Sequence, residues 1–181
     1  MITSALLTNY LLDYVHLNLQ QMGFVVSAIG FGGSAGSVIM PMISDRVGRK
    51  PVMIASSIGA AVSLVFFIKS GASPTALFGF LFATHFFNFA LITLTVGPLS
   101  GESVPVTMMA AASGLVICIG ELFGGGAMPI IAGFVAQNYG IQSTLPLAVA
   151  ALVFGCANSC LLRETAPVRW SRAHISGSFG D

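Results

Sequence analysis

The 181-residue chain is 55% hydrophobic and only 7% charged, with a formal net charge of +1 at pH 7. A soluble globular domain carries about 25% charged residues, so this composition excludes a water-soluble domain and predicts a polytopic membrane protein. The small net charge and the lack of a basic stripe exclude nucleic acid as a partner.

The apolar stretches predict an all-α bundle of transmembrane helices, because about 20 apolar residues in a helix cross the roughly 30 Å hydrocarbon core. Residues 1–14 are too short for this and are expected to be the outer part of a truncated first helix. Five complete spans are predicted at 22–44, 51–68, 75–99, 106–136 and 144–162. Together these segments form one membrane domain, 1–165, and residues 166–181 are expected to be a disordered tail.

The first complete span is rich in glycine. Each glycine in a helix costs roughly 1 kcal/mol relative to alanine, so the sequence needs a reason to keep them. In membranes the reason is close approach of two helix backbones. The Gly32-x-x-x-Gly36 pattern therefore predicts a contact stripe against another helix, which is a packing feature and not a functional one.

A cluster of charges separates the first two complete spans. Residues 44–51 read Ser-Asp-Arg-Val-Gly-Arg-Lys-Pro, which predicts a tight loop at the membrane surface. Gly48 can supply the positive φ that such a turn often needs. Pro51 suits the first turn of the following helix, where its missing N–H costs nothing.

The later spans carry two further patterns. The phenylalanines of residues 75–99 are interpreted as lipid-facing or core-filling side chains. Three successive glycines, Gly124 to Gly126, and Pro129 predict a bend or a loosened turn in the span 106–136. The loop between these two spans carries Glu102 and is expected to lie in the cytoplasm.

The basic residues indicate the orientation of the chain in the membrane. If the spans alternate in direction, only Lys69 lies on one side, while six basic residues lie on the other. Those six are Arg46, Arg49, Lys50, Arg163, Arg169 and Arg172. Because cytoplasmic loops carry the excess of Lys and Arg, the C-terminal tail is predicted to be cytoplasmic.

The loop motif Asp45-Arg46-x-Gly48-Arg49-Lys50 resembles the loop signature of the major facilitator superfamily of secondary transporters. Glu102-Ser-Val-Pro105 and Arg163-Glu-Thr-Ala-Pro167 resemble the ends of the tenth and twelfth helices in members that move organic acids and related small solutes. The family signature usually opens with glycine where this chain has Pro41. The resemblance covers nearly the whole chain and implies the C-terminal half of such a transporter, helices seven to twelve.

The resemblance implies a secondary active transporter of the bacterial inner membrane that moves a small solute, an organic anion, with protons by alternating access. It also implies that the chain is a fragment whose missing N-terminal six-helix half forms the other side of the substrate cavity. A non-transporting membrane scaffold or assembly protein and an inactive fragment are the alternatives, and the genomic sequence upstream of Met1 distinguishes them. No nucleophile–base pair or metal-ligand spacing supports an enzyme, a cofactor or a metal site.

The candidate functional residues are polar groups near the middle of the spans, where ionisable side chains are costly. Glu121 is hypothesised to bind and release a proton, because desolvation disfavours its charged form; a hydrogen-bonded packing role is the alternative. His85 and Asn88, one turn apart, are candidates for contacting a polar substrate or another helix. Asn9 and Tyr10 are weaker candidates nearer the outer surface.

Asp45 has a mechanical role by resemblance. In the family this aspartate helps to latch one conformation, together with the adjacent basic residues and a neighbouring helix N-terminus, for which the helix beginning at Pro105 is the expected partner. A carboxylate near a helix N-terminus gains roughly 0.3–1 kcal/mol. The alternative is a solvated loop charge that only sets topology.

Overall fold

The computed structural model of the chain describes residues 7–102 and 104–161. Within these ranges the chain is helical and contains no strand, which confirms the predicted all-α bundle. The predicted tail at 166–181, the motif at 163–167, Ser103 and the first six residues lie outside the described residues.

The helices begin and end within three residues of the predicted spans. In chain order they are η1 (Tyr10–Tyr14), α2 (Leu19–Val47), α3 (Arg49–Lys69), α4 (Pro74–Leu94), η2 (Thr95–Leu99), α5 (Ser100–Glu102), η3 (Val106–Met108), α6 (Met109–Gly120), η4 (Glu121–Ala127), α7 (Met128–Tyr139), η5 (Ile141–Ser143) and α8 (Thr144–Leu161). Four segments of the described chain are long and apolar enough to cross a membrane: Leu19–Val47, Arg49–Lys69, Pro74–Leu99 and Val106–Tyr139. The helix Thr144–Ser159 is apolar but shorter.

The start of α2 corrects one detail of the sequence interpretation. The first complete span was predicted to begin at residue 22, but α2 already begins at Leu19. Asn18 Oδ1 accepts a hydrogen bond from the Gln21 N–H at 2.8 Å, and Gln21 Oε1 accepts one from the Asn18 N–H at 3.3 Å. This capping box satisfies two donors of the first turn, so the helix can start before residue 22.

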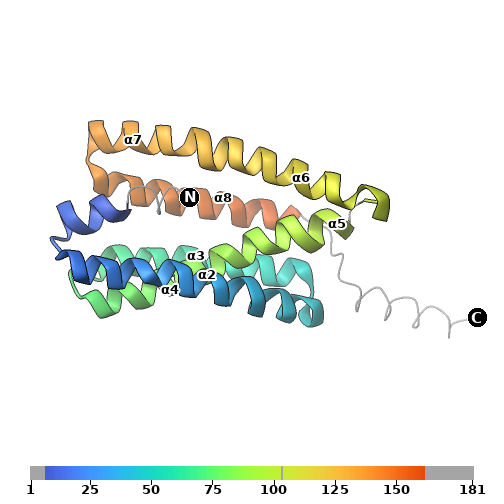
Figure 1. Ribbon diagram of the computed structural model, residues 1–181, viewed down its shortest axis with the longest axis horizontal. Helices are drawn as coiled ribbons and strands as arrows, with labels where there is room; N and C mark the ends of the chain where they lie inside the picture. Colours follow the sequence, from blue (N-terminus) through green and yellow to red (C-terminus); the bar gives the residue numbers. More distant parts are fainter. Residues whose placement is uncertain (1–6, 103, 162–181) are drawn as a thin grey trace, which may run out of the picture.

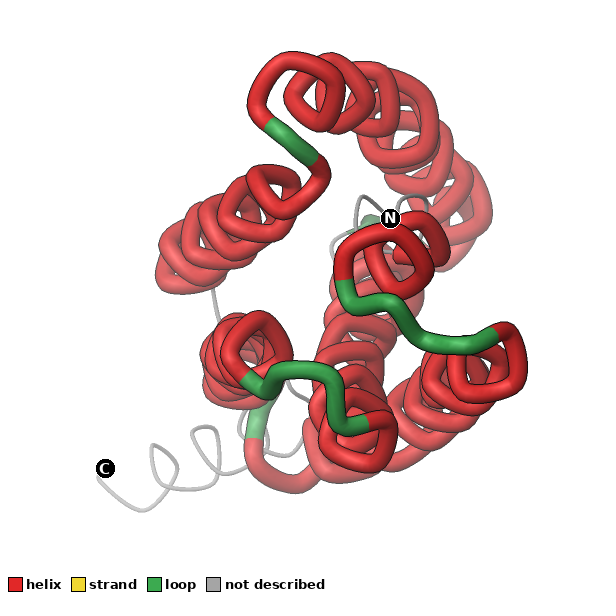
Figure 2. The backbone as a smooth tube through the Cα atoms, turned by 90° about the vertical axis from the view of Figure 1, so that its left-hand side faces the viewer, coloured by secondary structure: helices red, strands yellow, loops and turns green. Residues whose placement is uncertain are grey.

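The helices form a packed layer with a separate rod beside it. Helix α4 lies between α2 and α3, and α3 in turn contacts α8. The segments α6, η4 and α7 follow one another as a continuous rod on the far side of α8 (Figure 1). The view along the bundle shows the described chain as helices joined by short loops, with no strand in the part that the structure describes (Figure 2).

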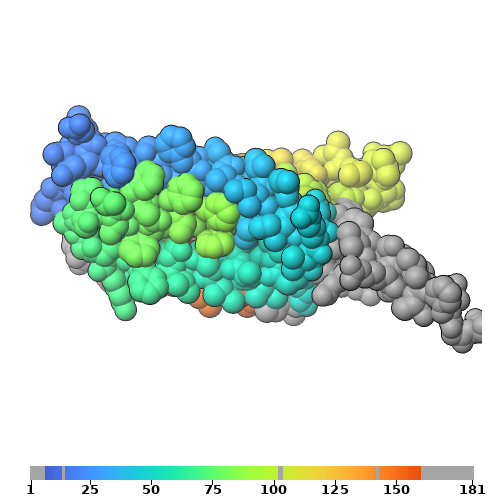
Figure 3. All heavy atoms as spheres, turned by 90° about the horizontal axis from the view of Figure 1, so that it is seen from below, coloured from blue at the N-terminus to red at the C-terminus, as the bar shows by residue number. Residues whose placement is uncertain are grey.

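Glycines hold α2 against α4. A β carbon placed on Gly32 would lie 2.5 Å from the carbonyl oxygen of Phe82, and one on Gly36 would overlap the carbonyl oxygen of Phe86. Only glycine lets the two backbones come this close. The predicted Gly32–Gly36 contact stripe is therefore confirmed, and α2, α4 and α3 form the continuous surface seen in Figure 3.

The phenylalanines fill the same layer. The rings of Phe24 and Phe78 stack with their centroids 4.7 Å apart, which joins α2 to α4. Phe66 and Phe80 stack at 5.6 Å and join α3 to α4. Offset aromatic stacks of this kind add about 0.5–1.5 kcal/mol beyond their area burial. These rings are packing elements, in agreement with the sequence interpretation.

The rod of α6, η4 and α7 is far more exposed than the layer. In its most apolar stretch only 6% of the residues are buried, against 28–39% for the other three long spans. The turn η4 is a π-helix, in which the N–H of Met128 bonds to the carbonyl of Phe123, five residues back. This is the loosened turn predicted from Gly124 to Gly126 and Pro129.

Candidate functional site

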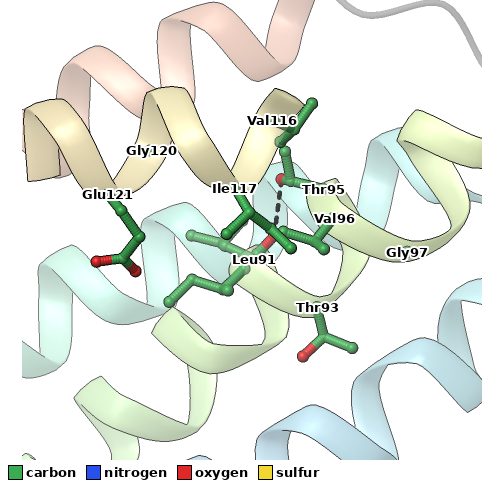
Figure 4. Close-up of a pocket in the computed structure, with 10 residues that line it drawn as sticks. Leu91, Thr93, Thr95, Val96, Gly97, Val116, Ile117, Gly120 and Glu121 are labelled. Atoms are coloured by element: carbon green, nitrogen blue, oxygen red, sulfur yellow. Dashed lines mark hydrogen bonds between the residues drawn. The ribbon is translucent and has the colours of Figure 1, made fainter. Parts of the chain in front are cut away.

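A pocket of about 650 Å³ lies between the C-terminal part of α4 with η2 and the rod formed by α6 and η4 (Figure 4). Its walls are mostly aliphatic, and no phenylalanine lines it. The lining residues are Leu91, Ile92, Thr93, Thr95, Val96, Gly97, Val116, Ile117, Gly120 and Glu121. A concave, largely apolar site with few polar groups is typical of small-molecule binding.

A π-helix contributes to the lining of the pocket on each side. On one side η2 contains Pro98, which has no N–H to continue the α-helical ladder. On the other side η4 contains the three successive glycines. Isolated π-turns inside α-helices are frequent at functional sites. The turn in η4 was predicted from its glycines and Pro129, whereas η2 was not, although Gly97-Pro98 was the available signal.

The polar side chains among the described lining residues belong to two threonines and Glu121. Thr95 donates its hydroxyl proton to the carbonyl oxygen of Leu91 at 2.7 Å (dashed in Figure 4), so its oxygen lone pairs remain to accept. Glu121 is exposed and contributes the one ionisable side chain among the lining residues. None of the described residues that line the pocket is basic, so it suits a mostly aliphatic solute that brings a proton or a hydrogen-bond donor.

The other candidates from the sequence do not line this pocket. His85 is buried in α4, with Nδ1 3.1 Å from the carbonyl oxygen of Leu81 and its ring centroid 6.4 Å from that of Phe89. Asn88 is half-buried on the same helix. The structure therefore does not bring Glu121 and His85 into one described pocket.

The two N-terminal candidates have different surroundings. Asn9 is exposed. Tyr10 belongs to the hydrophobic core, with its ring centroid 6.1 Å from that of Phe67. A buried aromatic ring in such a cluster stabilises the fold by removing a large apolar area from water.

The charged corner between α2 and α3 is built as predicted. Gly48 has φ 122°, and α3 starts at Arg49 with Pro51 in its first turn. Arg49 is buried, pairs with the carboxylate of Asp45 and donates to Ser44 Oγ at 3.4 Å. Asp45 thus pairs with an adjacent basic residue.

The other two basic residues of this corner are more exposed than Arg49. Arg46 is exposed on the last turn of α2. Lys50 is half-buried on the first turn of α3. The backbone of Glu102 ends α5, whereas its side chain lies outside the described residues.

The family model described as Major Facilitator Superfamily matches residues 1–177 of the chain. A protein of Haemophilus influenzae, provisionally named as a metabolite transport protein, is 28% identical over 78% of this chain and 34% of its own length. An MFS-type transporter of Bacillus subtilis, itself uncharacterised, is 29% identical over 71% of this chain and 32% of its length.

A third relative, from Cupriavidus pinatubonensis, is provisionally named as a 4-methylmuconolactone transporter. It is 25% identical over 77% of this chain and 32% of its own length. The chain therefore spans about a third of the length of these curated relatives. No solved structure gives a significant match.

Proposed function

The chain belongs to the Major Facilitator Superfamily, and from that premise we propose that it carries a small organic acid across the membrane together with a proton. The observation that carries the proposal is the position of Glu121, a carboxylate on the wall of an aliphatic pocket inside a membrane-spanning bundle. Ionisable groups at such positions mark substrate and proton paths by default.

The charge of the pocket explains why the solute and the proton travel together. Among the described lining residues, an organic anion that enters the pocket meets one carboxylate and no basic side chain. Two carboxylates that lie close together repel each other, so binding of the anion favours uptake of one proton by the pair. That proton lies on the solute or on Glu121, and its uptake and release couple the solute to the proton gradient. The relative named for 4-methylmuconolactone fits a small organic solute of this class.

The exposed apolar surface of the rod favours a partner that covers it. Its apolar side chains are exposed along α6, η4 and α7, in contrast to the packed layer. In a superfamily transporter the substrate cavity lies between two helical halves. We propose that this face lies against a second six-helix half, with the C-terminus of the chain in the cytoplasm of a bacterial cell.

The remaining polar residues have subordinate roles in this proposal. Asp45, held by Arg49 at the cytoplasmic corner, biases one conformation of the transporter. His85 and Asn88 lie on α4, the helix whose C-terminal part lines the pocket, and are proposed to contact the solute when α4 moves during alternating access. Asn9 and Tyr10 are proposed to act near the outer end of the path.

The experiment is an uptake assay on the complete reading frame, expressed in cells lacking competing transporters. The probes are radiolabelled aliphatic monocarboxylates and 4-methylmuconolactone, with and without an imposed proton gradient. The proposal predicts gradient-driven uptake of at least one of these acids and loss of that drive in Glu121→Gln. Full gradient-driven uptake in Glu121→Gln would refute the role of Glu121, and a folded protein that carries none of the probes favours a scaffold.

A further inference from the structure

Gly125 lies one helical turn after Glu121, in the middle of the glycine run of η4. A β carbon placed on Gly125 would lie 2.6 Å from Oε2 of Glu121 and 3.7 Å from its Cδ. The carboxylate thus occupies the space that a side chain at position 125 would fill. The neighbouring glycines differ: Gly124 has nothing within 4 Å, and Gly126 meets only the backbone oxygen of Glu121, at 3.8 Å.

We infer that Gly125 is a positioning residue for Glu121: its missing side chain lets the carboxylate lie back along η4 at the edge of the pocket. The inference rests on the proposed role of Glu121 in transport. By this inference the middle glycine of the run positions Glu121, and the two flanking glycines do not.

The direction of the Glu121 side chain supports this assignment. The side chain lines the pocket, yet its carboxylate lies against the next turn of its own helix. Position 125 follows position 121 along the rod, whereas the pocket residues Val116 and Ile117 precede it. The side chain therefore leans away from the part of the pocket lined by α6. This leaves the aliphatic volume open to a solute and keeps the carboxylate at the rim.

A substitution at Gly125 should act on the carboxylate and leave the helix intact. Gly125 has no positive φ, so an alanine can adopt its backbone conformation. Alanine also stabilises a helix by roughly 1 kcal/mol relative to glycine. The atom that a new β carbon meets is the end of a flexible side chain. The adjustment that disturbs the structure least is a change of rotamer at Glu121. In the new rotamer the carboxylate moves from the rim into the pocket, and this lowers the apparent affinity for solute.

The test reads the state of Glu121 directly, with a hydrophobic carbodiimide that labels protonated carboxyl groups in apolar surroundings. Labelling is measured across pH in membranes containing the full chain, with Glu121→Gln marking the signal that belongs to this residue. Gly125→Ala should change the labelling rate of Glu121 by about threefold or more at some pH, as expected for coupled neighbours. Gly124→Ala is the matched control and should label like the unmodified chain.

Two results would overturn the inference. One is an unchanged labelling profile in Gly125→Ala. The other is a Gly125→Ala protein that no longer elutes as a single folded species while Gly124→Ala does, because position 125 would then have a backbone role.

Measurements of uptake distinguish a failure of this inference from a failure of the proposed function. Gly125→Ala should raise KM more than it lowers kcat, because the displaced carboxylate occupies solute space. If Glu121→Gln keeps full proton-driven uptake, the proposed function fails, while a changed labelling profile in Gly125→Ala still supports the positioning role. If Glu121→Gln loses that uptake and Gly125→Ala changes neither labelling nor KM, the positioning role fails alone.

Discussion

The α2–α4 contact and the α6–η4–α7 rod are both rich in glycine, but they use it in opposite ways. In α2, Gly32 and Gly36 lie against the backbone of α4, so each missing side chain is filled by another helix. In the rod, Gly120 and Gly124 meet nothing, and Gly125 meets the side chain of Glu121. Glycine fixes the first region by close packing, whereas in the second it accompanies a π-turn and leaves space for the carboxylate of Glu121.

This comparison separates the part of the chain that holds the fold from the part that carries the proposed chemistry. The layer of α2, α3 and α4 contains the stacked phenylalanines and most of the buried side chains. The rod supplies Glu121 and one wall of the pocket. Mutations in the layer should therefore affect mainly the stability of the bundle, whereas mutations in the rod should affect mainly transport.

The largest effect is expected from Gly36→Leu, which would force a side chain into the backbone of α4 at Phe86. Overpacking of a tight contact costs about 1–3 kcal/mol or more. We expect a large loss of monodisperse protein and a lower melting temperature in detergent. Gly30→Leu, on the same helix with nothing within 4 Å, is the control and should retain both. Equal losses in the two variants would mean that α2 does not pack on α4 in this way.

Glu121→Gln should have a large effect on transport and almost none on stability, because Glu121 is exposed in the rod. Loss of the carboxylate that is proposed to carry the proton should lower gradient-driven uptake by about tenfold or more, which corresponds to about 1.4 kcal/mol. The melting temperature should stay the same. A drop in melting temperature with normal uptake would instead assign Glu121 to packing.

Asp45→Asn should have an intermediate effect, confined to conformational exchange. Asp45 is 61% exposed and pairs with the buried Arg49, so water weakens the pair. Loss of a partly exposed charge interaction of roughly 0.3–1 kcal/mol should change the uptake rate about two- to fivefold. The measurement is the rate of solute exchange at saturating solute concentration. Unaltered exchange would leave Asp45 as a charge that sets topology only.

The smallest effect is expected where the layer meets the rod. Ser100 Oγ and Ser113 Oγ lie 2.9 Å apart and join α5 to α6. Hydrogen bonds between membrane helices contribute about 0.6 kcal/mol on average, so Ser113→Ala should lower the melting temperature slightly. Ser27→Ala, which removes only a bond to the carbonyl of Phe24 in the same helix, should lower it less.

The sequence predicted the fold well because its strongest signals are local. Apolar length places the spans, the Asp45–Lys50 charges place the corner, and Gly32 and Gly36 predict the contact with α4 without naming that helix. The pocket was not predictable in the same way. Thr93 and Thr95 are ordinary residues of an apolar span, and only the packing of α4 and η2 beside the rod places them in one pocket with Glu121.

The surroundings of a side chain follow less from the depth of the residue along its span than from its position around the helix. Glu121, His85 and Asn88 were expected at similar depth. Depth follows from counting residues along a span, but the direction of a side chain depends on which neighbours the helix has. Helix α4 turns His85 towards the buried core, whereas the π-turn after Gly120 leaves Glu121 on the pocket wall.

If the pocket between α4 and the rod belongs to a solute path, its wall faces water and not lipid. The direct measurement is the rate at which a water-soluble thiol reagent labels Ile117→Cys, on the pocket wall, compared with Ala151→Cys, exposed on α8. Both are made in a background where Cys118, Cys156 and Cys160 are serine. Position 117 should be labelled at least about tenfold faster than position 151, since reagent access follows water. Equal, slow labelling at both positions would contradict it.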